Sequence, residues 1–229
     1  MTRFLTSLIE QAERPLAKVC GLTGQRDVEL AAAAGADLLG LVSYPKSPRH
    51  LSDLQVVALG HIIEKLAARS VLVIVDADRA GVDRLVHEAR LDAVQLCGME
   101  EPGDWRNTSY GLLRRIGVDE HGDAELAAWK GIADAFVLDH PSSAGGSGRT
   151  VDPEHAAEFA REAPCFLAGG LDGDAGVFHH APSIGLYRGF DASSRLEIEP
   201  GTKDPDRVKS FIDAAHRYSK GNAPSQDHD

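Results

Sequence analysis

Short apolar runs alternate along the chain with longer stretches in which apolar residues recur at helical spacing. The runs predict eight strands, at residues 18–20, 38–42, 71–75, 93–96, 112–116, 135–138, 165–168 and 189–192. Most runs are continuously apolar, as in strands that are buried on both faces. The stretches between them predict helices at residues 25–34, 52–68, 79–89, 124–130, 153–161 and 205–218. Residues 99–107 contain Pro102 and Gly103 and have room only for a short helix.

A strand followed by a helix, repeated along the chain, predicts parallel strands joined by crossover helices. The number of strands favours an α/β fold of the (β/α)8 barrel type, in one domain, over an open doubly wound sheet. The length of 229 residues also suits such a barrel. We expect residues 17–219 to form the barrel. Residues 1–16 should add a short helical N-terminal extension, and residues 220–229 a flexible tail.

Composition and charge argue against several classes of partner. The chain has 24 Lys and Arg against 35 Asp and Glu, a net charge of −11. This charge disfavours nucleic acid and anionic membrane surfaces, but a local cluster of donors can still hold a small anion. No run approaches the roughly 18 apolar residues of a membrane helix, and the N-terminus does not resemble a secretory signal. Three scattered cysteines predict reduced thiols in a cytoplasmic protein, with no disulfide framework and no metal site.

In a barrel of this kind, functional groups lie at the C-terminal ends of the strands and in the loops that follow. Gly169 and Gly170 follow the seventh predicted strand, and Ser193 and Ser194 follow the eighth, where barrels often bind phosphate. Glycines let backbone N–H groups approach an anion, and serine hydroxyls add donors. A tight turn would also explain the two glycines. Residues 141–148, rich in Ser and Gly, predict a long active-site loop after the sixth strand.

Two further strand ends carry groups that can transfer protons. Asp139 ends an apolar run, where desolvation raises a carboxyl pKa toward the range of a general acid; it could equally cap a helix or order a loop. Cys20 could be a small core residue or a base. As a base it would need a lowered pKa, for which Lys18 is the candidate cause, because residues two apart on a strand share a face.

Several segments, in order and with compatible spacing, resemble phosphoribosylanthranilate isomerases, enzymes of tryptophan biosynthesis. They are residues 18–23, 35–37, 44–49, 94–98, 138–139, 145–150, 168–171 and 191–194, followed by Glu197 and residues 200–204. The resemblance covers about residues 17–217, and the combination is specific although no single segment is. It implies a (β/α)8 barrel and a cofactor-free Amadori rearrangement of N-(5-phosphoribosyl)anthranilate to a carboxyphenylamino-deoxyribulose phosphate. It leaves open whether the protein is a monomer or a homodimer.

The resemblance also implies residue roles. Asp139 corresponds to the general acid that opens the ribose ring, and Cys20 to the base that removes the C2 proton. Arg49 corresponds to an arginine near the anthranilate end of the substrate. Further substrate contacts are implied for Lys18, Gln95, Cys97, Gly146 and Gly148, and a phosphate site for Gly169, Gly170, Asp191, Ser193 and Ser194.

Three positions depart from the family pattern. Cys97 stands where the family usually has His, Arg195 where it has Gly, and Ser43 where Phe is common. We predict an active isomerase, because Cys20 and Asp139 are both retained. The alternatives are a related isomerase acting on another aminosugar phosphate, and a barrel that binds a phosphorylated ligand without turnover.

Overall fold

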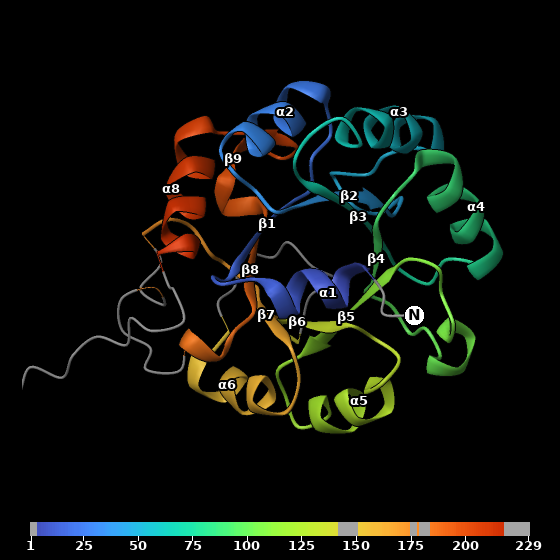
Figure 1. The fold of residues 1–229 in the computed structure, drawn as a ribbon, viewed down its shortest axis with the longest axis vertical. Coiled ribbons are helices and arrows are strands. Elements are labelled where there is room, and N and C mark those ends of the chain that lie inside the picture. Colours follow the sequence, from blue (N-terminus) through green and yellow to red (C-terminus); the bar gives the residue numbers. More distant parts are fainter. Residues whose placement is uncertain (1–3, 142–150, 175–177, 179–183, 218–229) are drawn as a thin grey trace, which may run out of the picture.

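The computed structural model describes residues 4–141, 151–174, 178 and 184–217. Within them, parallel strands close into a barrel in which each strand pairs with the next and the last pairs with the first (Figure 1). The strands are β1 (Leu16–Cys20), β2 (Leu38–Ser43), β3 (Arg69–Ile74), β4 (Ala93–Leu96), β5 (Gly111–Gly117), β6 (Ala135–Asp139), β7 (Cys165–Leu167) and β8 (Gly189–Ala192). The predicted (β/α)8 barrel is therefore confirmed, and the open sheet is excluded.

Helices surround the barrel on the outside, as crossover connections require (Figure 1). They are α2 (Gln25–Ala33), α3 (Asp53–Ile63), α4 (Arg79–Ala89), α5 (Gly122–Trp129), α6 (Pro153–Glu162) and α8 (Pro205–His216). A further helix, α1 (Phe4–Gln11), precedes β1. Short 3-10 helices η1 (Pro102–Trp105), η2 (Ile184–Leu186) and η3 (Ser194–Leu196) and a hairpin of β9 (Glu197–Glu199) and β10 (Thr202–Lys203) complete the described elements. The fourth crossover contains only η1, as the Pro and Gly in that segment predicted.

The prediction was wrong about the length of one helix. The sequence predicted a helix over residues 52–68, but α3 ends at Ile63. After it, Lys65 N–H donates to the Ile62 carbonyl and Leu66 N–H to the Ile63 carbonyl. Bonding to the third residue back, instead of the fourth, tightens the chain and ends the helix before β3 begins. The apolar residues that follow continue the hydrophobic pattern and hide this boundary in the sequence.

The helix α1 closes the N-terminal end of the barrel. Leu5 and Ile9 are buried and pack in one cluster with Leu16, Leu38 and other apolar residues of the barrel interior. Gly111 opens β5 without a side chain, and a Cβ there would lie only 2.6 Å from the Leu5 Cβ. Because this end is covered, a ligand can reach the barrel interior only from the C-terminal ends of the strands.

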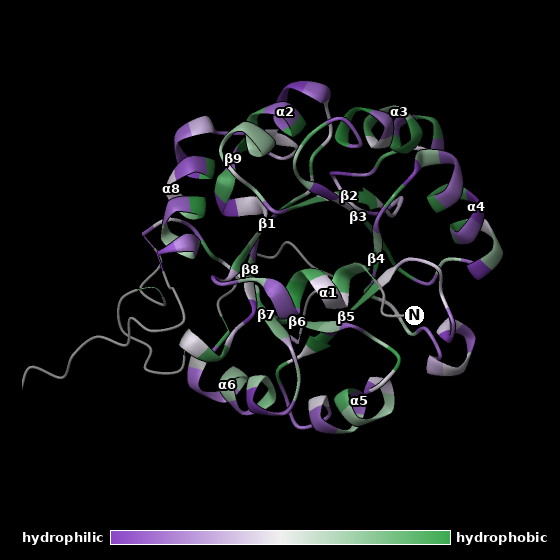
Figure 2. Cartoon of the chain, in the orientation of Figure 1, coloured by the Kyte–Doolittle hydropathy of each residue, from purple (hydrophilic) through white to green (hydrophobic). Residues whose placement is uncertain are grey.

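The apolar residues gather on the strands and on the helix sides that face them (Figure 2). A second cluster of buried residues between strands and helices includes Leu39, Leu72, Leu112, Phe136 and Phe190. None of the described helices is long and apolar enough to cross a membrane. The barrel thus provides a rigid frame for side chains at its open end.

Candidate active site

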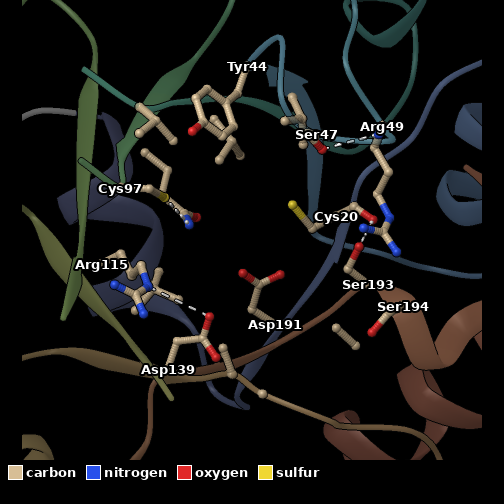
Figure 3. A pocket seen from close by; sticks show the side chains of 18 of the residues that line it. Cys20, Tyr44, Ser47, Arg49, Cys97, Arg115, Asp139, Asp191, Ser193 and Ser194 are labelled. Atoms are coloured by element: carbon tan, nitrogen blue, oxygen red, sulfur yellow. Dashed lines mark hydrogen bonds and ion pairs between the residues drawn. The ribbon is translucent and has the colours of Figure 1, made fainter. Parts of the chain in front are cut away.

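A cavity of about 200 Å³ opens at the C-terminal ends of the strands (Figure 3). It brings together every predicted site residue that the structure describes except Lys18. These are Cys20, Arg49, Gln95, Cys97, Asp139, Gly169, Gly170, Asp191, Ser193 and Ser194. Gly146 and Gly148 lie outside the described residues. Residues distant in sequence thus meet at one site, as expected when parallel strands end on the same rim.

Asp139 is the last residue of β6, and its carboxyl is 11% exposed. One oxygen accepts a hydrogen bond of 2.8 Å from the His140 backbone N–H, and the other lies 3.7 Å from Arg115 Nε. Burial raises the pKa of Asp139 above its ordinary value, and the Arg115 charge opposes this shift. The carboxyl therefore orders the chain after β6 and also has the raised pKa that the sequence predicted for an acid.

Cys20 is the last residue of β1, and its thiol points into the cavity (Figure 3). Gly40 on β2 leaves space for it, because a Cβ at that position would lie 2.7 Å from Cys20 Sγ. Burial raises the pKa of the Cys20 thiol, and the Lys18 charge opposes this only in part. Lys18 therefore acts on the pKa of Cys20 in the direction expected from the sequence, but the pKa lies above its ordinary value, not below it as a base would need. The reason is that desolvation of the thiol is the larger effect.

Lys18 lies behind the cavity and has no exposed surface. Its Nζ donates a hydrogen bond of 2.7 Å to Asp191 Oδ2, between directly paired residues of β1 and β8. Although burial acts to lower the pKa of Lys18, the Asp191 carboxylate raises it, so the ammonium stays charged. Direct contact between Lys18 and a ligand, which the resemblance implied, does not fit this burial. Lys18 instead holds Asp191, whose carboxyl points into the cavity (Figure 3).

Arg49 is committed to a buried ion network. Its Nε and Nη2 donate to the two carboxylate oxygens of Glu197 at 2.7 and 2.6 Å. Lys203 Nζ donates to the same carboxylate at 2.8 Å and to the Ser193 carbonyl at 3.2 Å. Burial alone would raise the pKa of Glu197, but bonds from Arg49 and Lys203 hold it below its ordinary value. This network fixes the loop after β8 to the loop after β2.

The predicted phosphate segments flank one side of the cavity. Gly169 and Gly170 have φ angles of 86° and 66°, a conformation that glycine adopts without strain. The Ser193 hydroxyl donates to the Cys20 carbonyl at 3.0 Å, so this donor already has a protein partner. Ser194 lines the cavity beside it. Arg195 is exposed and lies within η3. Its φ angle is not positive, so the arginine causes no backbone strain at this position, where the family has glycine.

Gln95 and Cys97 end the wall formed by β4. Gln95 Nε2 donates to Cys97 Sγ at 3.3 Å, while Gln95 Oε1 is buried without a hydrogen-bond partner. Burial raises the pKa of the Cys97 thiol to about 12, so this residue is neutral at ordinary pH. Tyr44 lines the cavity, whereas Ser43 does not. Of the three departures from the family pattern, Cys97 and Arg195 line the cavity, whereas Ser43 does not.

Sequence reasoning missed Arg115, which lines the cavity from β5. Its neighbour Arg114 points the other way and forms ion pairs with Glu100 and Glu125. A signal was present, because two successive arginines in a buried strand must face opposite sides of the barrel wall. The apolar residues around the two arginines predict a strand, but they do not show which arginine faces the cavity.

Among the described residues, no group of three or more His, Cys, Asp or Glu side chains is arranged to hold a metal ion. Cys165 opens β7 and does not line the cavity. A (β/α)8 barrel with a buried carboxyl and a thiol facing one cavity has the layout of a barrel enzyme that transfers protons. The chain belongs to the N-(5'-phosphoribosyl)anthranilate isomerase family, because the model of that family matches residues 17–214.

Individual relatives agree with this assignment. The N-(5'-phosphoribosyl)anthranilate isomerase of Azorhizobium caulinodans is 34% identical over 221 residues, which are 91% of this chain and 95% of the relative. A solved structure of monomers derived from the dimeric isomerase of Thermotoga maritima is 27% identical, with a TM-score of 0.73, over 88% of this chain and 98% of that one. An isomerase solved with reduced 1-(o-carboxyphenylamino)-1-deoxyribulose 5-phosphate has a TM-score of 0.73 at 26% identity, over the same shares.

Proposed function

We propose that this chain is the isomerase of tryptophan biosynthesis that converts N-(5'-phosphoribosyl)anthranilate to 1-(2-carboxyphenylamino)-1-deoxyribulose 5-phosphate. The observation that carries the proposal is that Cys20 and Asp139 face the same cavity from β1 and β6. The rearrangement needs one acid and one base, and no electrons leave the substrate. A barrel that only binds a phosphorylated ligand would need neither group at these positions.

Asp139 is the general acid in this mechanism. Its protonated carboxyl gives a proton to the ribose ring oxygen, the bond from that oxygen to C1 breaks, and the nitrogen lone pair forms an iminium. Burial favours the protonated carboxyl, because it raises the pKa of Asp139. The bond from the His140 N–H keeps the carboxyl oriented toward the cavity.

Cys20 is the general base. Its thiolate removes the proton at C2, the electrons of that bond form the C1–C2 double bond, and the iminium nitrogen becomes neutral. The resulting enolamine loses its hydroxyl proton and gains a proton at C1, which gives the ketone. The Lys18 charge behind the thiol supports the thiolate, although burial opposes it more strongly. The active form, thiolate with carboxylic acid, has the same net charge as the resting thiol with carboxylate.

We infer that the phosphate of the substrate binds beside the loops that follow β7 and β8. Backbone N–H groups near Gly169 and Gly170 and the side chain of Ser194 would contact it. Ser193 contributes through its backbone and its bond to Cys20, since its hydroxyl proton is already used. Asp191 carries a negative charge held by Lys18, so it suits a sugar hydroxyl better than a phosphate oxygen. Gln95 Oε1 is an acceptor for a second hydroxyl.

Genetic complementation tests this function. A tryptophan auxotroph that lacks only this isomerase should grow without tryptophan when it expresses the chain. The Asp139→Asn variant, expressed to the same level, should not restore growth. If the unaltered chain fails although it is expressed and folded, the proposed function is wrong, and another aminosugar phosphate becomes the substrate to test. Size-exclusion chromatography of the same protein decides between the monomer and the homodimer.

A further inference from the structure

The hairpin of β9 and β10 carries a lysine, Lys203, that has no exposed surface. The hairpin is fixed to the segment that follows Cys20. The Lys203 backbone N–H donates to Asp27 Oδ2 at 2.9 Å, and Thr23 Oγ1 donates to the Gly201 carbonyl at 2.6 Å. A lysine is almost never fully buried unless it is paired, so the partners of this ammonium indicate its purpose. Lys203 does not line the cavity, so any part it has in the reaction runs through other residues.

Hydrogen bonds connect the Lys203 ammonium to Cys20 through the loop after β8. Its Nζ donates to Glu197 Oε1 at 2.8 Å and to the Ser193 carbonyl at 3.2 Å. The Ser193 hydroxyl donates in turn to the Cys20 carbonyl at 3.0 Å. Gly21, the residue after Cys20, leaves space for this contact, because a Cβ there would lie 2.9 Å from Ser193 Oγ. Figure 3 shows Ser193 beside Cys20 at one side of the cavity.

Two buried cations share the single carboxylate of Glu197. Arg49 binds it at 2.6 Å and Lys203 at 2.8 Å, and within the described residues neither cation forms an ion pair with a second carboxylate. Arg49, Glu197 and Lys203 therefore hold two positive charges against one negative charge. The buried pair of Lys18 and Asp191, by contrast, is neutral as a unit.

A thiolate at Cys20 would balance this extra positive charge. Arg49 lies against the residue that follows Cys20, because a Cβ at Gly21 would be 2.3 Å from Arg49 Cδ. Burial raises the pKa of Cys20 most, and Asp191 raises it further, whereas Lys18 and Lys203 lower it. Since burial dominates, the thiolate depends on the positive charge around it. The charged and titratable groups that act on Cys20 within the described residues are Lys18 on β1, Arg49 after β2, Cys97 after β4, Asp191 on β8 and Lys203 on β10.

We propose that Lys203 is a positioning residue whose buried ammonium supplies the extra positive charge that stabilises the Cys20 thiolate. The inference rests on the proposed function, in which this thiolate removes the C2 proton of the substrate. Lys203 also holds the Ser193 carbonyl, which keeps the loop after β8 against Cys20. The charge of Lys18 is offset by Asp191, 2.7 Å away, so Lys18 cannot take over this role in full.

Alkylation of Cys20 by iodoacetamide tests this role without any substrate, because the thiolate is the species that reacts. The rate at Cys20 is measured at one fixed pH by mass spectrometry of the peptide that contains it. Lys203→Met should slow this rate by about threefold or more, since a higher pKa leaves less thiolate and greater nucleophilicity offsets only part of the loss. The double variant Lys203→Met with Glu197→Gln should recover most of the rate, because Arg49 then again has an unbalanced charge. Lys209→Met, at an exposed lysine of α8, is the matched control and should leave the rate unchanged.

Turnover by the same variants links the thiolate to the reaction. On the level part of the pH profile, kcat/KM should fall about tenfold in Lys203→Met for each unit by which the pKa of Cys20 rises. It should recover in the double variant. Binding of reduced 1-(o-carboxyphenylamino)-1-deoxyribulose 5-phosphate should stay close to that of wild type in both, because Lys203 does not line the cavity.

Unchanged alkylation of Cys20 in Lys203→Met would overturn the proposal. Equal slowing in Lys203→Met and in the double variant would overturn it as well, because the hairpin would then only support the shape of the site. If thermal unfolding shows that Lys203→Met is not folded, Glu197→Gln and the double variant give the same comparison. The double variant must then react more slowly than Glu197→Gln, and equal rates would overturn the proposal.

Failure of the proposed function has a different signature. Wild type would not turn over N-(5'-phosphoribosyl)anthranilate, although Lys203→Met still slowed the alkylation of Cys20.

Discussion

Lys18 and Asp191 form an ion pair of 2.7 Å across the junction where the first and last strands close the barrel. Their Cα positions are directly paired in the sheet, and the ammonium has no exposed surface. The same pair places the Asp191 carboxyl in the cavity and a positive charge behind the Cys20 thiol. Closure of the barrel and the electrostatics of the site therefore depend on the same two residues.

Removal of one partner should destabilise the protein strongly. Lys18→Met leaves the Asp191 carboxylate buried without its counter-ion, so the free energy of unfolding should fall by about 3 to 5 kcal/mol in urea titrations. The double variant Lys18→Met with Asp191→Leu removes both charges and should recover most of the lost stability, because the buried charge is the main cost. A Lys18→Met variant as stable as wild type would show that Asp191 is neutral in the folded protein.

The loops after β7 and β8 should determine the affinity for phosphate. Gly170→Val forces a β-branched residue to adopt a φ of 66° beside the anion, and Ser194→Ala removes a hydroxyl. Both substitutions should raise the KM for the substrate, and Gly170→Val should raise it more. Inorganic phosphate should compete with the substrate in wild type and more weakly in Gly170→Val. If phosphate does not compete, the anion binds elsewhere.

Arg195 should contribute little to binding, although it stands at a family glycine. It is exposed and its backbone is already relaxed within η3, so glycine at this position relieves no strain. Arg195→Gly should change the KM by at most a few-fold. A tenfold rise, about 1.4 kcal/mol, would instead make Arg195 part of the phosphate site. In that case the KM should rise with ionic strength, because salt screens an exposed ion contact.

The pH profile should depend on Arg115. In the proposed mechanism the active form holds Cys20 as a thiolate and Asp139 as an acid, with the pKa of Cys20 the higher of the two. Under this condition kcat/KM rises with pH up to the pKa of Asp139 and stays level from there to the pKa of Cys20. The acidic limb of the profile therefore reports the pKa of Asp139. Arg115→Met removes a charge that lowers the pKa of Asp139, so the limb should move to higher pH. It should stay in place in Arg115→Lys; movement to lower pH in Arg115→Met would contradict this assignment.

The barrel could be predicted from the sequence because continuous apolar runs such as residues 135–138 occur in strands buried on both faces, and helical stretches separate them. Asp139 and Cys20 could also be singled out as candidates, since both end such runs, but only the family resemblance implied their roles. Helix ends were harder to predict. The end of α3 at Ile63 is set by a change in backbone hydrogen bonding, which leaves the apolar pattern intact.

The partners of each charged side chain could not be predicted. Nothing in the local sequence shows that Glu197 binds Arg49, 148 residues away, or that Lys18 is paired with Asp191. The sign of the pKa shift of Cys20 depends on how much burial outweighs one lysine, and only the packed barrel determines this. Arg115 was missed because its direction depends on which side of the strand faces the cavity.

The most direct test of the central claim is single-turnover conversion of N-(5'-phosphoribosyl)anthranilate by wild type, Cys20→Ala and Asp139→Asn, with binding of the reduced product analogue measured on the same samples. We predict that each variant converts substrate more slowly by a factor of about 10² to 10⁴, the usual range for proton-transfer groups. Both should bind the analogue within a few-fold of wild type, because the barrel and the phosphate loops are unchanged. Near wild-type conversion by either variant would contradict the assignment of Cys20 and Asp139 as base and acid.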